Sequence, residues 1–253
     1  MGMVKFINNS VLIKQLDPVT CGEGCTTIGR GLSYVTKKGG AVHNKGNVTF
    51  QGDASFLVCY SQTDDTEERS KGGAISNNAP GVIYFMGDLT MKGNEVEVRQ
   101  GGAIYNRGDI VVDGDDIFYT NDASDGGGIY QEKWGTFEIN GMINFTNNDA
   151  FQSRGGAICN VGGVVNINGG SVFHNNGASC SGKCGYGGAI YNSDRGAITL
   201  TGSSTFSENG AWYGGAIYSN SIASYDDGET VAENLLHLIT FPDDTVFINN
   251  TAE

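Results

Sequence analysis

The sequence predicts an all-β protein, a right-handed parallel β-helix (solenoid) of about seven to eight three-stranded coils. Residues 187–209 hold one complete copy of its repeat: Gly-Gly-Ala-Ile-Tyr-Asn, then Gly-x-Ile-x-Leu-x-Gly, then Phe-x-x-Asn. Each piece alternates apolar and other residues between turn formers, as short strands do. Copies recur along most of the chain at nearly constant spacing, which is typical of a solenoid. The usual strand twist and crossover preference favour the right hand.

The first strand of each coil begins at a glycine pair. These pairs start at Gly39, Gly72, Gly101, Gly126, Gly155, Gly187 and Gly214. Successive residues of a strand point to opposite faces. We therefore expect the isoleucine of the piece, such as Ile104, to point into the core and the next residue, such as Tyr105, to point outward.

The second strand lies between two glycines, and its alternation places two apolar residues of each coil in the core. Like residues then stack from coil to coil at about 4.8 Å, and a single coil buries too little to fold alone. The predicted core residues are Val48, Phe50, Ile83, Phe85, Ile110, Val112, Phe137, Ile139, Val165, Ile167, Ile198 and Leu200.

The third strand places one large apolar residue in the core, and a second column follows three positions later. We expect the asparagines of that second column to form an internal amide ladder at a turn; exposed turn asparagines are the alternative. The core residues are Phe56, Met91, Phe118, Phe145, Phe173, Phe206 and Phe247. The second column is Cys59, Asn94, Asn121, Asn148, Asn176, Asn209 and Asn250.

Composition favours a single β-helix domain over residues 1–253, with loop insertions near 10–38 and 219–234. No Pro-rich or charge-block linker interrupts the repeat, and many of the 40 glycines fall at fixed offsets before strands. No apolar run approaches the roughly 20 residues of a membrane-spanning helix, and no signal peptide is visible at Met1. The net charge of −13 opposes nucleic-acid binding, because phosphate contacts need Lys and Arg.

The two ends of the chain have the same phase of the repeat. Phe-Ile-Asn-Asn stands at residues 6–9 and again at 247–250. An uncovered terminal coil is a sheet edge, which solenoids normally cap. We therefore expect the chain to be part of a longer protein, or its coils to stack end to end in a larger assembly.

Gly-Gly-Ala-Ile at 101–104, 155–158, 187–190 and 214–217, paired with Phe-x-x-Asn at 118–121, 145–148, 173–176, 206–209 and 247–250, resembles a known repeat. It is similar to the paired repeats of the chlamydial polymorphic outer-membrane protein family, over most of residues 39–250. The resemblance implies a right-handed parallel β-helix at the cell surface or outer membrane that acts in adhesion as an autotransporter passenger.

Aspartates give the first candidate site. Asp53, Asp88 and Asp115 follow the closing glycine of the second strand in three successive coils, and Asp116 stands beside them. Such a column repels itself unless it is solvated or binds a cation, and Ca²⁺ takes oxygen ligands of this kind. Solvated turn aspartates are one interpretation. The other is a calcium site at Asp53, Asp88 and Asp115, with all four residues catalytic in a polysaccharide lyase or hydrolase.

Tyrosines give the second candidate site. Tyr105, Tyr130, Tyr191 and Tyr218 share the outward position of the first strand. An aromatic stripe on a flat sheet can stack on sugar rings or form a protein interface, so we predict a binding face there. Cross-coil packing and ordinary β-propensity are the alternative explanation.

The chain has six cysteines, and two pairs each close a short loop. Cys21 with Cys25 and Cys180 with Cys184 are the disulfide candidates, while Cys59 and Cys159 fall on different columns. Disulfides would indicate an oxidising compartment. Two Cys-x-x-x-Cys pairs without a nearby histidine are a weak zinc signal.

The leading functional interpretation is a non-enzymatic extracellular or cell-surface module for adhesion or structural assembly, with a protein or polysaccharide as partner. We expect no nucleic acid, no membrane span and no cofactor other than calcium. The alternatives are the calcium-dependent polysaccharide lyase or hydrolase and an ice-binding protein. A repeated threonine array would favour ice binding, but the outward residues of the second strand are mixed: Thr49, Tyr84, Val111, Glu138, Asn166 and Thr199.

Overall fold

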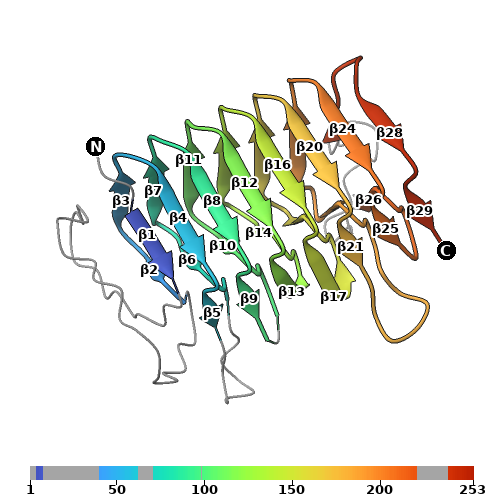
Figure 1. The fold of residues 1–253 in the computed structure, drawn as a ribbon, viewed down its shortest axis with the longest axis horizontal. Coiled ribbons are helices and arrows are strands. Elements are labelled where there is room, and N and C mark those ends of the chain that lie inside the picture. Colours follow the sequence, from blue (N-terminus) through green and yellow to red (C-terminus); the bar gives the residue numbers. More distant parts are fainter. Residues whose placement is uncertain (1–3, 8–39, 62–70, 98, 221–238) are drawn as a thin grey trace, which may run out of the picture.

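The computed structural model describes residues 4–7, 40–61, 71–97, 99–220 and 239–253. The paired strands form four parallel sheets that run along one elongated solenoid, and the colours of Figure 1 pass from blue to red along its long axis. The predicted parallel β-helix is confirmed. The expected three strands per coil are corrected to four, because a short fourth sheet of seven strands accompanies the other three.

The first sheet carries the glycine-pair pieces, and its register aligns their isoleucines from coil to coil. Gly101, the first glycine of its pair, has a φ of 74°, and a Cβ there would lie 2.2 Å from the carbonyl oxygen of Ile104. Only glycine fits this position. The strands are β2 (Val42–Asn44), β6 (Ile75–Asn77), β10 (Ile104–Asn106), β14 (Ile129–Glu132), β18 (Ile158–Val161), β22 (Ile190–Ser193) and β26 (Ile217–Asn220).

The second sheet places its alternating apolar residues in the core, as the period predicted. From Val48 to Leu200, all twelve predicted side chains are buried. The strands are β3 (Asn47–Phe50), β7 (Val82–Phe85), β11 (Asp109–Val112), β15 (Thr136–Ile139), β19 (Val164–Ile167), β23 (Ala197–Leu200) and β27 (Ile239–Thr240).

The third sheet stacks its phenylalanines along the axis. The ring centroids of Phe145 and Phe173 are 5.1 Å apart, and those of Phe173 and Phe206 are 4.5 Å apart. β1 pairs with β4 in the register predicted for an isolated third strand at the start of the chain. The strands are β1 (Val4–Ile7), β4 (Ala54–Leu57), β8 (Leu89–Lys92), β12 (Asp116–Tyr119), β16 (Ile143–Thr146), β20 (Ser171–His174), β24 (Ser204–Ser207) and β28 (Val246–Ile248).

The fourth sheet is built mostly from two-residue strands. Ala150, Ala178 and Ala211 form a small buried cluster of their own. Two residues cannot display an alternating pattern, which is why the sequence did not reveal this sheet. The strands are β5 (Tyr60–Ser61), β9 (Glu95–Val96), β13 (Asp122–Asp125), β17 (Asp149–Arg154), β21 (Gly177–Ala178), β25 (Gly210–Ala211) and β29 (Thr251–Ala252).

The predicted asparagine ladder is present at the turn from the third to the fourth sheet. Asn121 donates through Nδ2 to Asn148 Oδ1 at 2.9 Å, and Asn148 donates to Asn176 Oδ1 at 3.0 Å. The same Asn148 amide donates to the Phe118 carbonyl at 3.0 Å. The residue before each ladder position has φ between 49° and 62°, so the side-chain amides satisfy backbone groups at a left-handed turn.

A second amide ladder, which was not predicted, lies at the turn from the first to the second sheet. Asn44 donates to Asn77, Asn77 to Asn106, and Asn106 to Gln131, at 2.8–2.9 Å. The asparagine that ends the Gly-Gly-Ala-Ile-Tyr-Asn piece could have indicated this second ladder in the sequence. Both ladders fix the register that holds the functional side chains.

Candidate functional site

The tyrosine column forms in the predicted register but is not an exposed face. Tyr105 is fully buried, and Tyr130 and Tyr191 are 5% and 9% exposed. Tyr218 is partly buried and packs against the same cluster. The predicted binding face is therefore wrong for the first three tyrosines, because the residues immediately before the glycine pairs, from Lys71 onward, cover the outer side of the first sheet.

The covering residues pair in parallel from coil to coil, through isolated bridges and, for Asp125 with Arg154, through the pairing of β13 with β17. They are Lys71, Gln100, Asp125, Arg154, Tyr186 and Tyr213. Lys71 Nζ donates to the Tyr105 hydroxyl at 2.7 Å and lies 3.8 Å from Glu132 Oε2, and the Tyr105 hydroxyl donates to that carboxylate. Further along, Arg154 makes a two-pronged pair with Asp125 at 2.9 and 2.7 Å. These polar pairs close the outer side of the column.

Burial lowers the reactivity of the side chains in the tyrosine column. Desolvation raises the pKa of the Tyr130 hydroxyl, and it raises the pKa of the fully buried Cys159 thiol well above its usual value. The hydrogen bond to Asp125 raises the pKa of Arg154, so the Arg154 guanidinium stays charged. The Cys159 thiol and the Tyr130 hydroxyl therefore keep their protons at neutral pH and do not act as nucleophiles.

The register brings Asp53, Asp88 and Asp115 into one column, as predicted. Each carboxylate accepts a backbone N–H from the next coil: Asp53 from Asp88 at 3.2 Å, Asp88 from Asp115 at 2.9 Å, and Asp115 from Met142 at 2.8 Å. These hydrogen bonds give the column a structural role at the turn between the second and third sheets. Within the described ranges, no group of three or more His, Cys, Asp or Glu side chains is arranged to hold a metal ion.

Asp116 does not join that surface column. Its side chain is 2% exposed and faces the core, in register with Leu89 and Ile143. Oδ1 accepts the Leu89 N–H at 3.2 Å, while Oδ2 has no hydrogen-bond partner among the described residues. Desolvation, with smaller contributions from Asp88 and Asp115, raises the pKa of Asp116 to about 8. A polysaccharide on the surface would not reach this carboxyl, so its catalytic assignment is corrected.

A second acidic row, which the sequence did not reveal, lies in the fourth sheet. Glu95, Asp122 and Asp149 share one register position on β9, β13 and β17. Desolvation and the charges of Asp149 and Glu95 raise the pKa of Asp122 to about 6, and desolvation also raises the pKa of Asp149. In the sequence, these three acids each follow an asparagine of the first amide ladder: Asn94, Asn121 and Asn148.

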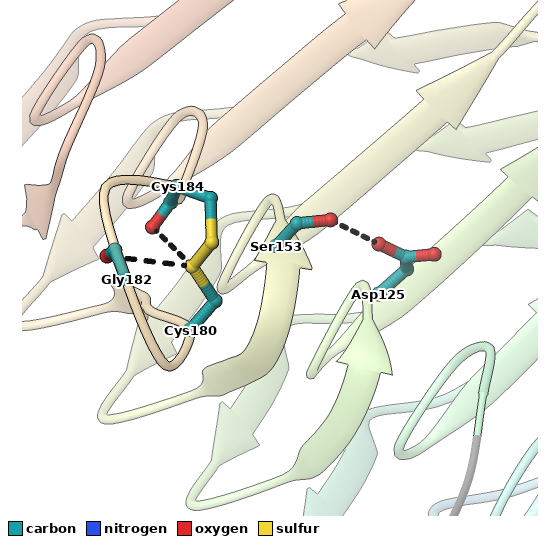
Figure 2. The surroundings of a disulfide bond; sticks show 5 residues. All are labelled: Asp125, Ser153, Cys180, Gly182 and Cys184. Atoms are coloured by element: carbon teal, nitrogen blue, oxygen red, sulfur yellow. Dashed lines mark hydrogen bonds between the residues drawn. A yellow bond between two sulfur atoms is a disulfide. The ribbon is translucent and has the colours of Figure 1, made fainter.

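Cys180 and Cys184 form the predicted disulfide, with Cα atoms 5.6 Å apart (Figure 2). Their loop borders a hollow of about 240 Å³ together with Trp212 and residues of β21, β25 and β29. Figure 2 also shows Ser153 donating to Asp125 at 3.4 Å, beside the covering segment. The other candidate pair, Cys21 and Cys25, lies outside the described residues.

Trp134 is an exposed residue that the sequence did not single out. It sits at the turn from β14 to β15, is 80% exposed and has a φ of 74°. Its signal was positional: it is the residue immediately before the glycine that opens the second strand.

Four parallel sheets with two buried amide ladders define a parallel β-helix repeat protein. The model of the Chlamydia polymorphic membrane protein repeat matches residues 203–220, which contain the Phe-x-x-Asn piece and the following Gly-Gly-Ala-Ile piece. The resemblance seen in the repeats is thereby confirmed. Searches of curated proteins and of solved structures gave no match. No described segment forms a helix with the length and apolarity needed to cross a membrane.

Proposed function

We propose that this chain is a non-enzymatic module of the cell surface or outer membrane that acts in adhesion or structural assembly. The observation that carries the proposal is the match of residues 203–220 to the polymorphic membrane protein repeat, on a chain that repeats the same motif pair along a parallel β-helix. That repeat belongs, by its description, to membrane proteins of Chlamydia.

The physical character of the fold supports a surface role. A continuous apolar core and two amide ladders make a long, self-stacked rod with outer faces that differ in chemistry. The aspartates of the surface column accept backbone N–H groups, which favours a structural role for them over the lyase alternative. The cystine of Cys180 and Cys184 is typical of an oxidising compartment.

Location is tested by labelling intact and permeabilised cells that express the protein with antibodies raised against the purified chain. We expect equal labelling of both, and loss of the signal when intact cells are treated with a protease. Labelling that requires permeabilisation would contradict the proposal.

Adhesion is tested by coating beads with the purified chain and counting their attachment to cultured cells, with soluble chain as competitor. We expect attachment that soluble chain competes away. Attachment equal to that of beads coated with an unrelated acidic protein would leave only the structural role.

A further inference from the structure

One edge of the solenoid carries exposed cations and a tryptophan. It consists of Lys45, Arg107, Lys133, Trp134 and Arg195, and we call it the basic edge. Lys45, Arg107, Trp134 and Arg195 each stand two residues before a strand position of the second sheet, and those positions are aligned in one register across the coils. The turn from the first to the second sheet therefore places these residues along one line parallel to the long axis.

All five side chains of the basic edge are exposed. Among the described residues, none of its four cations lies within 4.0 Å of a carboxylate, whereas Lys71 and Arg154 are paired with acids elsewhere. The acids nearest in sequence are Glu132, Asp109 and Asp194, and Asp194 is exposed next to Arg195. Glu132 accepts from Tyr105, and Asp109 accepts the Thr136 N–H at 3.2 Å. In a chain with 15 basic and 28 acidic residues, a line of cations with no carboxylate partner in the described part of the chain is a distinct surface.

The backbone supplies a second, independent observation. Trp134 and Arg195 have φ values of 74° and 63°, in the left-handed region that favours glycine. Gly162, which occupies the same position in the coil between them, has a φ of 75°. A non-glycine residue there costs on the order of 1–3 kcal/mol, and such strain concentrates at functional sites. Trp134 and Arg195 thus occupy backbone positions that glycine would adopt without strain.

We infer that the basic edge binds an acidic polysaccharide whose chain lies along the solenoid axis. Coils repeat at about 4.8 Å, so the cations from Lys45 to Arg195 span about 24 Å, with neighbours about 5 to 10 Å apart. Carboxylate or sulfate groups contact the Lys and Arg side chains, and Trp134 stacks on a sugar ring between them. The inference rests on the proposed surface function and names the chemistry of the partner.

The spacing favours a polysaccharide over a nucleic acid. Duplex DNA carries one charge per roughly 1.7 Å, much denser than the cations of the basic edge. A net charge of −13 also repels such a dense polyanion at long range. A sparsely charged polymer that runs along one edge avoids the acidic rows of the other turns.

The test measures binding of the full chain to immobilised hyaluronate, a polysaccharide with one carboxylate per disaccharide, over a range of salt concentrations. We expect the quadruple variant with Lys45→Gln, Arg107→Gln, Lys133→Gln and Arg195→Gln to bind at least tenfold more weakly, with a flatter salt dependence. Trp134→Ala should bind about tenfold more weakly with the salt dependence unchanged, because stacking releases no counterions.

Two control variants are matched in chemistry and placed elsewhere. Lys183 lies over the Trp212 ring at 5.3 Å, so the double variant Lys183→Gln, Trp212→Ala removes a lysine and a tryptophan away from the basic edge. Lys92→Gln removes an exposed cation from the outer face of β8. Both should retain binding, and far-ultraviolet circular dichroism and urea melts establish that all variants are folded.

Absence of hyaluronate binding, or equal binding by the quadruple variant, overturns the inference. Tighter binding of a single-stranded oligonucleotide than of hyaluronate at equal ionic strength overturns it too, because the polymer class is then wrong. Cell adhesion that survives in the quadruple variant after hyaluronate binding is lost counts against the inference and leaves the proposed function standing. Intact hyaluronate binding on a chain that labels only inside cells counts against the proposed function alone.

Discussion

Asp116 illustrates how one buried carboxyl can contribute to the pH dependence of the stability of the solenoid. It occupies a core position that Leu89 fills on one neighbouring coil and Ile143 on the other. Its pKa of about 8 means that the folded protein keeps this proton at neutral pH, whereas the unfolded chain releases it near the ordinary value of 3.8. Between these two values the folded state binds more protons, so the free energy of unfolding falls as pH rises.

The Asp116→Asn variant should lack this share of the pH dependence. In the wild type, Asp116 contributes a loss of up to about 1.4 kcal/mol per pH unit between pH 4 and 8. We therefore expect the free energy of unfolding of the variant, measured in urea, to rise steadily relative to that of the wild type as the pH increases from 4 to 8. Asp122 and Asp149, whose pKa values are also raised, act in the same direction in both proteins and cancel in the difference.

Asp113→Asn is the control for this titration. Asp113 is exposed, and the hydrogen bond from Tyr84 lowers its pKa, so its contribution to stability does not fall between pH 4 and 8. The stability curve of Asp113→Asn should therefore run parallel to that of the wild type in this range. If Asp116→Asn and the wild type kept parallel stability curves from pH 4 to 8, the buried proton would not exist.

Val58 is a second residue whose replacement should change stability. It is β-branched, 57% exposed and has a φ of 53°, while Gly93 takes the equivalent position in the next coil. Relief of the left-handed strain exceeds the entropy that glycine adds to the unfolded chain. We expect Val58→Gly to raise the free energy of unfolding by about 1 kcal/mol in urea titrations.

Val164→Gly provides the contrast. Val164 is also a partly exposed valine but lies in the extended strand β19. Glycine there should lower stability by roughly 1 kcal/mol, since it adds flexibility and removes packing. Equal signs for the two variants would mean that strain at Val58 is negligible.

At the scale of the element, the amide ladder is the device that joins strands into coils. Asn148 Oδ1 accepts from both the backbone and the side chain of Asn121, while its amide donates to Phe118 and Asn176. Asn148→Ala leaves these buried groups without partners, at about 1–3 kcal/mol for each unsatisfied group. We expect a loss of at least 2 kcal/mol in chemical unfolding.

Asn144→Ala is the matched control, because Asn144 lies on the adjoining strand β16 and its side chain is exposed. It should change stability by less than about 0.5 kcal/mol. If Asn148→Ala lost no more stability than Asn144→Ala, water would have replaced the hydrogen bonds of the lost amide.

The elements also show which features a sequence reveals. The second-strand core, and the third-strand core from Phe56 to Phe206, were predictable because large apolar residues recur at the same position of each coil. Phe247, which was also predicted in the core, is 52% exposed on the last strand of the third sheet. The fourth sheet and the burial of the tyrosines were not predictable. The residues that cover Tyr105 and Tyr191 include Lys71 and Arg154, whose shared role arises from their backbone bridges rather than from shared chemistry. The aspartate column was correctly aligned, but its hydrogen bonds and the inward turn of Asp116 depended on the exact start of β12.

At the scale of the molecule, each coil contacts chiefly its neighbours, so coils should be removable in phase. Deletion of residues 129–157 would place Ile158 where Ile129 pairs with Ile104, and the columns would continue. We expect a folded, shorter solenoid that unfolds cooperatively with a smaller urea m-value, since less surface is exposed.

Deletion of residues 129–158, one residue more, is the control. It puts Cys159 in the place of Ile129 and moves each following side chain of that strand to the other face. This variant should be clearly less stable than the in-phase deletion. Similar stability for both would mean that the turns absorb the shift and that register is not what holds the coils together.

The direction of the inter-coil hydrogen bonds also determines how the rod responds to mechanical force. These bonds point along the long axis, because the sheets are parallel and each strand pairs with the coil above and below. A pull between the two ends therefore peels one coil after another instead of shearing a sheet as a unit. The 27 residues from Asn94 to Asn121 make up one coil, and when it opens they extend to roughly 90 Å of chain. Tethered between two bodies, such a rod would yield in steps and dissipate tension while its remaining coils stay wound.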